Sequence, residues 1–142
     1  MRVVTVRGIH GGVGASFIAS GLAYAFAAIG EKTLAIDAAA SPESAFLRFF
    51  NFPSVTPLGW LTEGAASPFL SNTWQYVPNL DVLPGGEVRS ASAKARFADV
   101  MREAERAGYT MLLVDDGYAG DSAGGGADDS RRCRHDAFGC QS

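Results

Sequence analysis

The feature that most constrains the fold is a glycine-rich turn between a β-branched segment and a long apolar one. Residues 2–7 (RVVTVR) are rich in valine and threonine, and the glycines of residues 11–14 follow closely. Beyond the turn, apolar residues recur at helical spacing over 14–29, and Gly30 is placed as a C-terminal stop. In the order strand, glycine turn, helix, backbone amides at a helix N-terminus are positioned to bind phosphate.

The chain continues to alternate apolar strands with helices as far as Asp116. The predicted strands are 32–37, 79–86 and 109–116, and the predicted helices are 92–107 and a short one with Ser41 as N-cap, Pro42 at the first position and Glu43 in the first turn. Prolines and glycines in 51–71 indicate loops, with at most a short helix around Trp60. This pattern predicts an α/β fold, a doubly wound and mostly parallel sheet with helices on both faces, over residues 1–116.

The two long helices have different sequence patterns. The segment 14–29 contains no charged residue, so we expect it to be buried on most sides. The segment 92–107 is amphipathic, and its predicted core stripe consists of Phe97, Val100, Met101 and Ala104.

Composition narrows the class of protein. The chain has 142 residues, of which 47% are hydrophobic, and a formal net charge of −3, so it can bury a core and carries no basic excess for nucleic acid. The N-terminus does not resemble a secretory leader, and the longest apolar stretch, 17–29, is shorter than the roughly 20 residues that span a bilayer. We therefore expect a cytoplasmic protein without direct membrane insertion.

Residues 117–142 differ in composition from the rest of the chain. They are rich in Gly, Asp, Arg and Cys and show no periodicity, which predicts disorder. The abrupt change in composition indicates out-of-frame translation or a degraded end. If regular structure ends at Asp116, the strand 2–7 is expected to become an exposed apolar edge.

Several stretches together resemble a known family. HGGVGAS, the apolar helix, GEKTLAID and LLVDD resemble the MinD/ParA family of deviant Walker A ATPases, and GLAYAFAAIGEKTLAIDAAAS, FLRFFNF, GWL and LDVLPGGE look most like its cellulose-operon branch, the BcsQ or YhjQ type. The resemblance implies the N-terminal half of a P-loop NTPase-like domain that binds ATP or ADP with Mg²⁺. It also implies a cytoplasmic partner of the inner-membrane cellulose synthase complex that regulates or localises the complex, and a homodimer.

The family roles can be placed on this sequence. The nucleotide-binding residues implied are His10, Gly11, Gly12, Val13, Gly14, Ala15, Ser16, Phe17 and Asp37, with Ser16 and Asp115 toward Mg²⁺. Both lysines of the family loop are replaced, by His10 and Ala15, and Ala39 stands where a second switch carboxylate positions water. Losing one charge-assisted contact of about 1.5–3 kcal/mol weakens binding without abolishing it. Hydrolysis needs these groups together, so we expect it to be weak or absent.

The sequence also allows other interpretations of the function. The chain could be a scaffold that binds no nucleotide or a truncated product without function, and Asp37 and Asp115 could be polar strand ends. GIHGGVG also fits the turn of an NAD(P)-binding short-chain dehydrogenase, although no Tyr-x-x-x-Lys pair is present. Cys133, His135, Asp136 and Cys140 could be drawn as a zinc site, but their spacing is uncommon.

Overall fold

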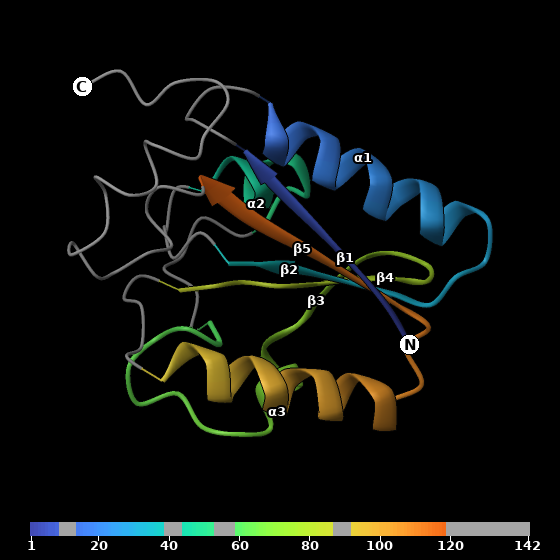
Figure 1. Cartoon of the computed structure of the whole chain (residues 1–142). Coiled ribbons are helices and arrows are strands. Elements are labelled where there is room, and N and C mark those ends of the chain that lie inside the picture. The colour runs from blue at the N-terminus through green and yellow to red at the C-terminus, as the bar shows by residue number, and fades with distance from the viewer. Residues whose placement is uncertain (9–13, 39–43, 53–58, 87–91, 119–142) are drawn as a thin grey trace, which may run out of the picture.

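A computed structural model describes residues 1–8, 14–38, 44–52, 59–86 and 92–118 (Figure 1). The strands are β1 (Arg2–Gly8), β2 (Thr33–Asp37), β3 (Trp74–Val77), β4 (Leu80–Leu83) and β5 (Met111–Tyr118). The helices are α1 (Ala15–Ala28), α2 (Ala45–Phe49) and α3 (Ala93–Arg106), with a 3₁₀ turn at Phe69–Asn72. The residues of the proposed zinc site and the tail 119–142 lie outside the described residues.

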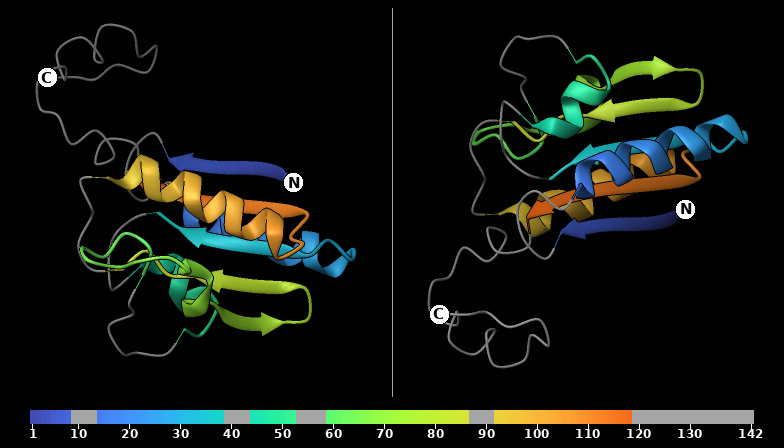
Figure 2. Two further views of the ribbon diagram at one scale, coloured as in Figure 1. Left: turned by 90° about the horizontal axis from the view of Figure 1, so that it is seen from below. Right: turned by 90° about the horizontal axis from the view of Figure 1, so that it is seen from above.

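The strands form one five-stranded sheet in the order β1-β5-β2-β4-β3. All neighbouring strands are parallel except β3 and β4, which form an antiparallel hairpin. Helix α1 lies on one face and α3 on the other (Figure 1), and β1 and β3 form the two margins of the sheet (Figure 2). The predicted α/β fold, with helices on both faces of a mostly parallel sheet, is confirmed.

Strand β3 was not expected from the sequence. Its four residues WQYV are all at least partly exposed, so they lack the continuous apolar run that identifies a central parallel strand. Asn79 has a φ of 69° in the turn to β4, and this left-handed conformation allows the tight hairpin. Tertiary pairing at the edge of the sheet, rather than hydrophobic pattern, therefore fixes β3.

The short helix α2 begins later than the sequence suggested. Its N-cap residue is Ser44, whereas the predicted cap Ser41 lies outside the described residues. Phe46, Leu47 and Phe50 are buried against the α1 side of the sheet, which explains why such a short helix is stable here.

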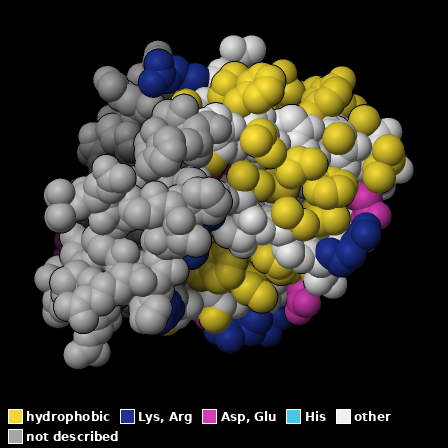
Figure 3. All heavy atoms as spheres, turned by 45° about the horizontal axis from the view of Figure 1, so that its top comes forward, with side chains coloured by type: hydrophobic (Ala, Val, Ile, Leu, Met, Phe, Trp, Pro, Cys, Tyr) yellow, Lys and Arg dark blue, Asp and Glu magenta, His cyan; other side chains and the backbone are white. Residues whose placement is uncertain are grey.

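The expectation that α1 is buried on most sides is wrong. Its buried positions are Ala19, Ser20, Ala23 and Ala27, which form a single narrow face of small residues. Phe17, Ile18 and Tyr24 are at least half exposed, and Figure 3 shows hydrophobic side chains gathered on the side that carries α1. The lack of charged residues in α1 therefore does not mean that the helix is buried. Only its small residues face the sheet, and its large apolar side chains are exposed.

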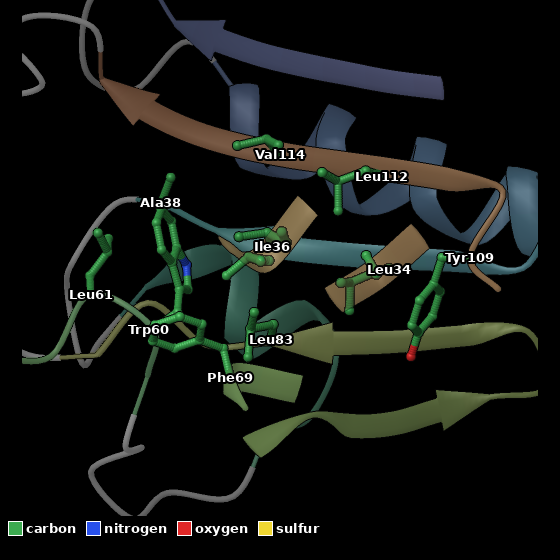
Figure 4. Packing of buried hydrophobic residues seen from close by; sticks show 12 residues of the cluster. Leu34, Ile36, Ala38, Trp60, Leu61, Phe69, Leu83, Tyr109, Leu112 and Val114 are labelled. Atoms are coloured by element: carbon green, nitrogen blue, oxygen red, sulfur yellow. The ribbon is translucent and has the colours of Figure 1, made fainter. Parts of the chain in front are cut away.

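The core on the opposite face is built from α3, the inner strands and the loop that carries Trp60. Val100 and Ala104 of α3 are fully buried, while Phe97 and Met101 pack partly against the cluster, as the stripe predicted. Trp60 lies close to Phe69 and Leu83 (Figure 4), and its ring packs against Phe97 of α3 with the centroids 5.8 Å apart. The loop segment that carries Trp60 thus forms part of the core.

Candidate functional site

The carboxyl ends of β1, β5 and β2 lie side by side next to the start of α1. Gly14 precedes the helix with a φ of 78°. This left-handed backbone conformation explains why a glycine stands at the last position of the turn. Ala15 and Ser16 are the first two helical residues. His10, Gly11, Gly12 and Val13 lie outside the described residues, as does Ala39.

Ser16 and Asp115 form a polar pair at this edge. The Ser16 hydroxyl donates a hydrogen bond of 2.8 Å to Oδ2 of Asp115, which is fully buried in β5. Asp37, also fully buried, is directly opposite Asp115 in the register of β2 and β5. Ala35 and Leu113, each two residues before one of the carboxylates on the same strand, pack toward α1, so both carboxylates lie on the α1 face of the sheet.

The structure therefore brings three of the predicted site residues together. Ser16, Asp37 and Asp115 share one corner, where hydroxyl and carboxylate oxygens are the donors that Mg²⁺ prefers. Phe17 does not point into this corner, because its ring is 66% exposed and packs edge-on against Phe49 of α2 with the centroids 5.6 Å apart. Ala15 has only a methyl group where the family loop has a lysine.

Trp60 holds the end of β2 from the other face. Its indole Nε1 donates a buried hydrogen bond of 2.9 Å to the main-chain oxygen of Asp37, and the amide of Ala38 donates one of 2.9 Å to the main-chain oxygen of Asp115. These two bonds fix the backbone on which both carboxylates are carried. Sequence reasoning did not find this role, and the only signal was the GWL stretch of the resemblance.

The loop around Trp60 is itself locked to the end of β4. The amides of Trp60 and Leu61 donate to the main-chain oxygens of Pro84 and Gly85. A Cβ atom on Gly59 would lie 2.2 Å from the carbonyl carbon of Gly85, so the two backbones cross at a distance that only glycine permits. Nη1 of Arg96 donates to the main-chain oxygen of Thr62 at 2.8 Å and ties the loop to α3.

A pocket lies on the α3 face at the same end of the sheet. It has a volume of about 350 Å³ and is lined by Thr5, Arg7, Ala38, Trp60, Ala93, Lys94, Phe97, Val114 and Asp116. Arg7 and Asp116 form an ion pair in it, with Nε 2.6 Å from Oδ2. These charges belong to the face opposite Ser16, because Asp116 and Asp115 point to opposite sides of β5.

Solved structures with the same fold define the class. The chain is similar to a chain of the MinC:MinD cell division protein complex of Aquifex aeolicus, with a TM-score of 0.68 and 22% identity over 87% of this chain and 50% of that one. It is also similar to a plasmid partition protein of Borrelia burgdorferi, with a TM-score of 0.58 and 17% identity over 82% of this chain and 56% of that one. This chain therefore has the fold shared by these cell division and plasmid partition proteins.

Within this class, the sequence comparisons identify the family. The family described as cellulose biosynthesis protein BcsQ matches residues 1–116, and the chain belongs to it. The BcsQ protein of Salmonella typhi is 34% identical over 95 residues, which cover 63% of this chain and 36% of that protein. BcsQ of Salmonella typhimurium is 33% identical over 93 residues, 62% of this chain and 35% of that protein. The chain thus spans about a third of the length of these relatives.

Proposed function

We propose that this chain is a cellulose-biosynthesis-associated nucleotide-binding protein that holds ATP or ADP with Mg²⁺ weakly and hydrolyses ATP slowly or not at all. The observation that carries the proposal is the hydrogen bond between Ser16 at the start of α1 and the buried Asp115. It joins a helix N-terminus, which attracts phosphate, to a carboxylate suited to a divalent cation.

The donor set fits the ion. Ser16 and Asp115 would hold Mg²⁺ with the help of water, Asp37 would lie close by, and Gly14 would present the end of the phosphate turn to the nucleotide. The bound ion supplies positive charge that offsets the charge of the phosphates. Backbone amides and the α1 dipole orient the phosphates, but Ala15 contributes no cation, so binding rests on weaker contacts than in the family loop.

Titration calorimetry with ATP and ADP, each with and without Mg²⁺, tests nucleotide binding. We expect a dissociation constant that Mg²⁺ lowers and that Ser16→Ala raises about tenfold, because a charge-assisted contact is lost. Ser20→Ala is the matched control, since its hydroxyl donates to the main-chain oxygen of Phe17 inside the same helix and lies one turn from the site. It should bind as the unmodified chain does.

The second candidate is a scaffold that uses no nucleotide. The exposed apolar side chains of α1 favour it, because a large uncharged surface on a helix typically marks a protein contact. Absence of heat at millimolar nucleotide, with and without Mg²⁺, would leave only this candidate. Binding of NAD in a separate titration would instead favour the interpretation as a dehydrogenase-like fragment.

The cellular part of the proposal is association with cellulose synthase at the inner membrane through protein partners, from the cytoplasm. It is supported by family membership. Among the described helices, none is long and apolar enough to cross a bilayer. Deleting the gene should lower the amount of cellulose made and plasmid-borne expression of the same chain should restore it, whereas unchanged cellulose would contradict the proposal.

A further inference from the structure

The peptide unit between Asp37 and Ala38 is held at both of its polar groups. Its N–H donates to the main-chain oxygen of Asp115 at 2.9 Å, beside the last registered pair of β2 with β5. Its C=O points the opposite way, toward β4, but the pairing of β2 with β4 ends one residue earlier, at Ile36. The indole N–H of Trp60 donates to this C=O at 2.9 Å. A side chain from the α3 face of the sheet thus takes the place of a strand partner.

The position of this peptide unit determines where the two carboxylates of the site lie. The C=O belongs to Asp37 itself, so its bond to the indole restrains the main-chain ψ angle beside the Cα atom that carries the carboxylate. The N–H ties the same unit to Asp115, whose carboxylate accepts a hydrogen bond from Ser16. Mg²⁺ requires nearly ideal octahedral geometry, so a small displacement of these oxygens weakens its binding.

Trp60 is held rigidly by other described residues. It is only 3% exposed, and its ring packs against Phe97 of α3 and lies close to Leu83 (Figure 4). Its amide donates to the main-chain oxygen of Pro84 at 3.1 Å, and its own main-chain oxygen accepts from Nη1 of Arg96 at 3.2 Å. The indole donor is therefore in place before any ligand binds, and binding does not have to order this side chain.

We propose that Trp60 is a positioning residue of the Mg²⁺ site and acts by fixing the peptide unit that joins Asp37 to Ala38. The inference rests on the proposed function, the binding of nucleotide with Mg²⁺. Trp60 acts through the backbone, because it lies on the face of the sheet opposite the carboxylates. Without the indole, the C=O of Asp37 loses its donor and the end of β2 shifts to find another. Residues that orient the ligands of a metal typically change its affinity about 10- to 100-fold.

Trp60→Phe removes the N–H donor and keeps an aromatic ring, and titration calorimetry with ATP measures the result. With Mg²⁺, the dissociation constant of ATP should rise about tenfold. Without Mg²⁺ it should change by less than about twofold, because backbone amides and the α1 dipole orient the phosphates and the carboxylates do not. A merely structural role would weaken binding equally under both conditions.

Phe97→Leu is the matched control. It loosens the packing on the same ring and leaves the indole N–H in place. This variant should lose stability, yet bind ATP as the unmodified chain does, with and without Mg²⁺. Circular dichroism verifies that both variants are folded at the temperature of the titration.

Hydrogen exchange of the Trp60 indole N–H, followed by NMR, tests the same coupling without a substitution. Coupling is reciprocal, so if the bond raises the affinity for the ion about tenfold, the bound ion favours the bonded state by the same factor. With ATP and Mg²⁺ the exchange should slow about tenfold and then level off as the site fills, and with ATP alone it should change little. The indole of Trp74, which is 41% exposed on β3, is the internal reference and should not respond. Slowing that continues to grow with ligand concentration would indicate stabilisation of the whole fold instead.

The outcomes separate this role from the proposed function. If the unmodified chain binds no ATP in the presence of Mg²⁺, the proposed function and the role of Trp60 are both wrong. If the unmodified chain prefers ATP with Mg²⁺ but Trp60→Phe binds as tightly, or loses affinity equally without Mg²⁺, only the role of Trp60 is overturned. Indole exchange that ignores Mg²⁺, or that never levels off, overturns it as well.

Discussion

Helices α1 and α3 have the same length, 14 residues, and pack on opposite faces of one sheet, yet their outer surfaces differ. Helix α3 buries Val100 and Ala104 and presents charged residues to water, as is typical of an amphipathic helix at a protein surface. Helix α1 buries only small residues and leaves Phe17, Ile18 and Tyr24 exposed. Among the described residues, α3 therefore presents a polar surface, whereas α1 presents an apolar surface suited to contacts with other molecules.

The largest expected effect comes from placing the same charge on each helix. Val100→Glu puts a carboxylate into the fully buried α3 core and should abolish cooperative folding, a loss of more than about 4 kcal/mol. Ile18→Glu, at a side chain that is 52% exposed, should change the free energy of unfolding by no more than about 0.5 kcal/mol. Thermal unfolding of both variants measures the contrast, and equal losses would show that α1 is covered as fully as α3.

The sequence predicted the surface of α3 correctly but not that of α1. The buried stripe of α3 could be predicted because charged residues separate its apolar positions. The central strands could be predicted because nearly every residue in them is apolar. The uncharged sequence of α1 suggested burial, because composition alone does not show how many faces of a helix the rest of the chain covers. Strand β3 was missed because a half-exposed hairpin strand has no continuous apolar run.

The candidate site could be predicted to a similar extent. The glycine turn and the carboxylates at strand ends indicated Ser16, Asp37 and Asp115, and the structure places these three side by side. The hydrogen bond from Trp60 to Asp37 depends on a loop crossing the end of β4, a contact between distant segments with no local pattern. Whether these residues bind nucleotide stays a prediction.

The next effect compares a glycine in that crossing with one on α1. Gly59→Ala would place a methyl group 2.2 Å from the carbonyl carbon of Gly85, and the backbones must separate, at a cost of about 2–3 kcal/mol. Gly21→Ala meets nothing within 4 Å and should stabilise α1 by about 0.5–1 kcal/mol. Urea unfolding measures both changes. Destabilisation by Gly21→Ala would mean that the outer surface of α1 is already in close contact with something.

The smallest effect concerns a tyrosine on the α3 side. Tyr109 is buried and its hydroxyl donates to Asp81, and burial, followed by the hydrogen bond and the charge of Asp81, raises the pKa of Tyr109 well above its usual value. Tyr109→Phe should lower the free energy of unfolding by about 1–2 kcal/mol at neutral pH, because the hydrogen bond is lost while the ring remains. Tyr24→Phe, on the exposed face of α1, should change it by no more than about 0.5 kcal/mol.

The dependence on pH separates this bond from simple packing. Because the folded-state pKa is raised, the stabilisation by Tyr109 is fully present below the unfolded-state pKa of about 10 and decreases as the pH rises above it. The unmodified chain should therefore lose stability more steeply above about pH 10 than Tyr109→Phe does, and the difference between the two should shrink. Urea unfolding from neutral to alkaline pH measures that difference. A constant difference across the whole range would assign the loss to altered packing instead of the hydroxyl.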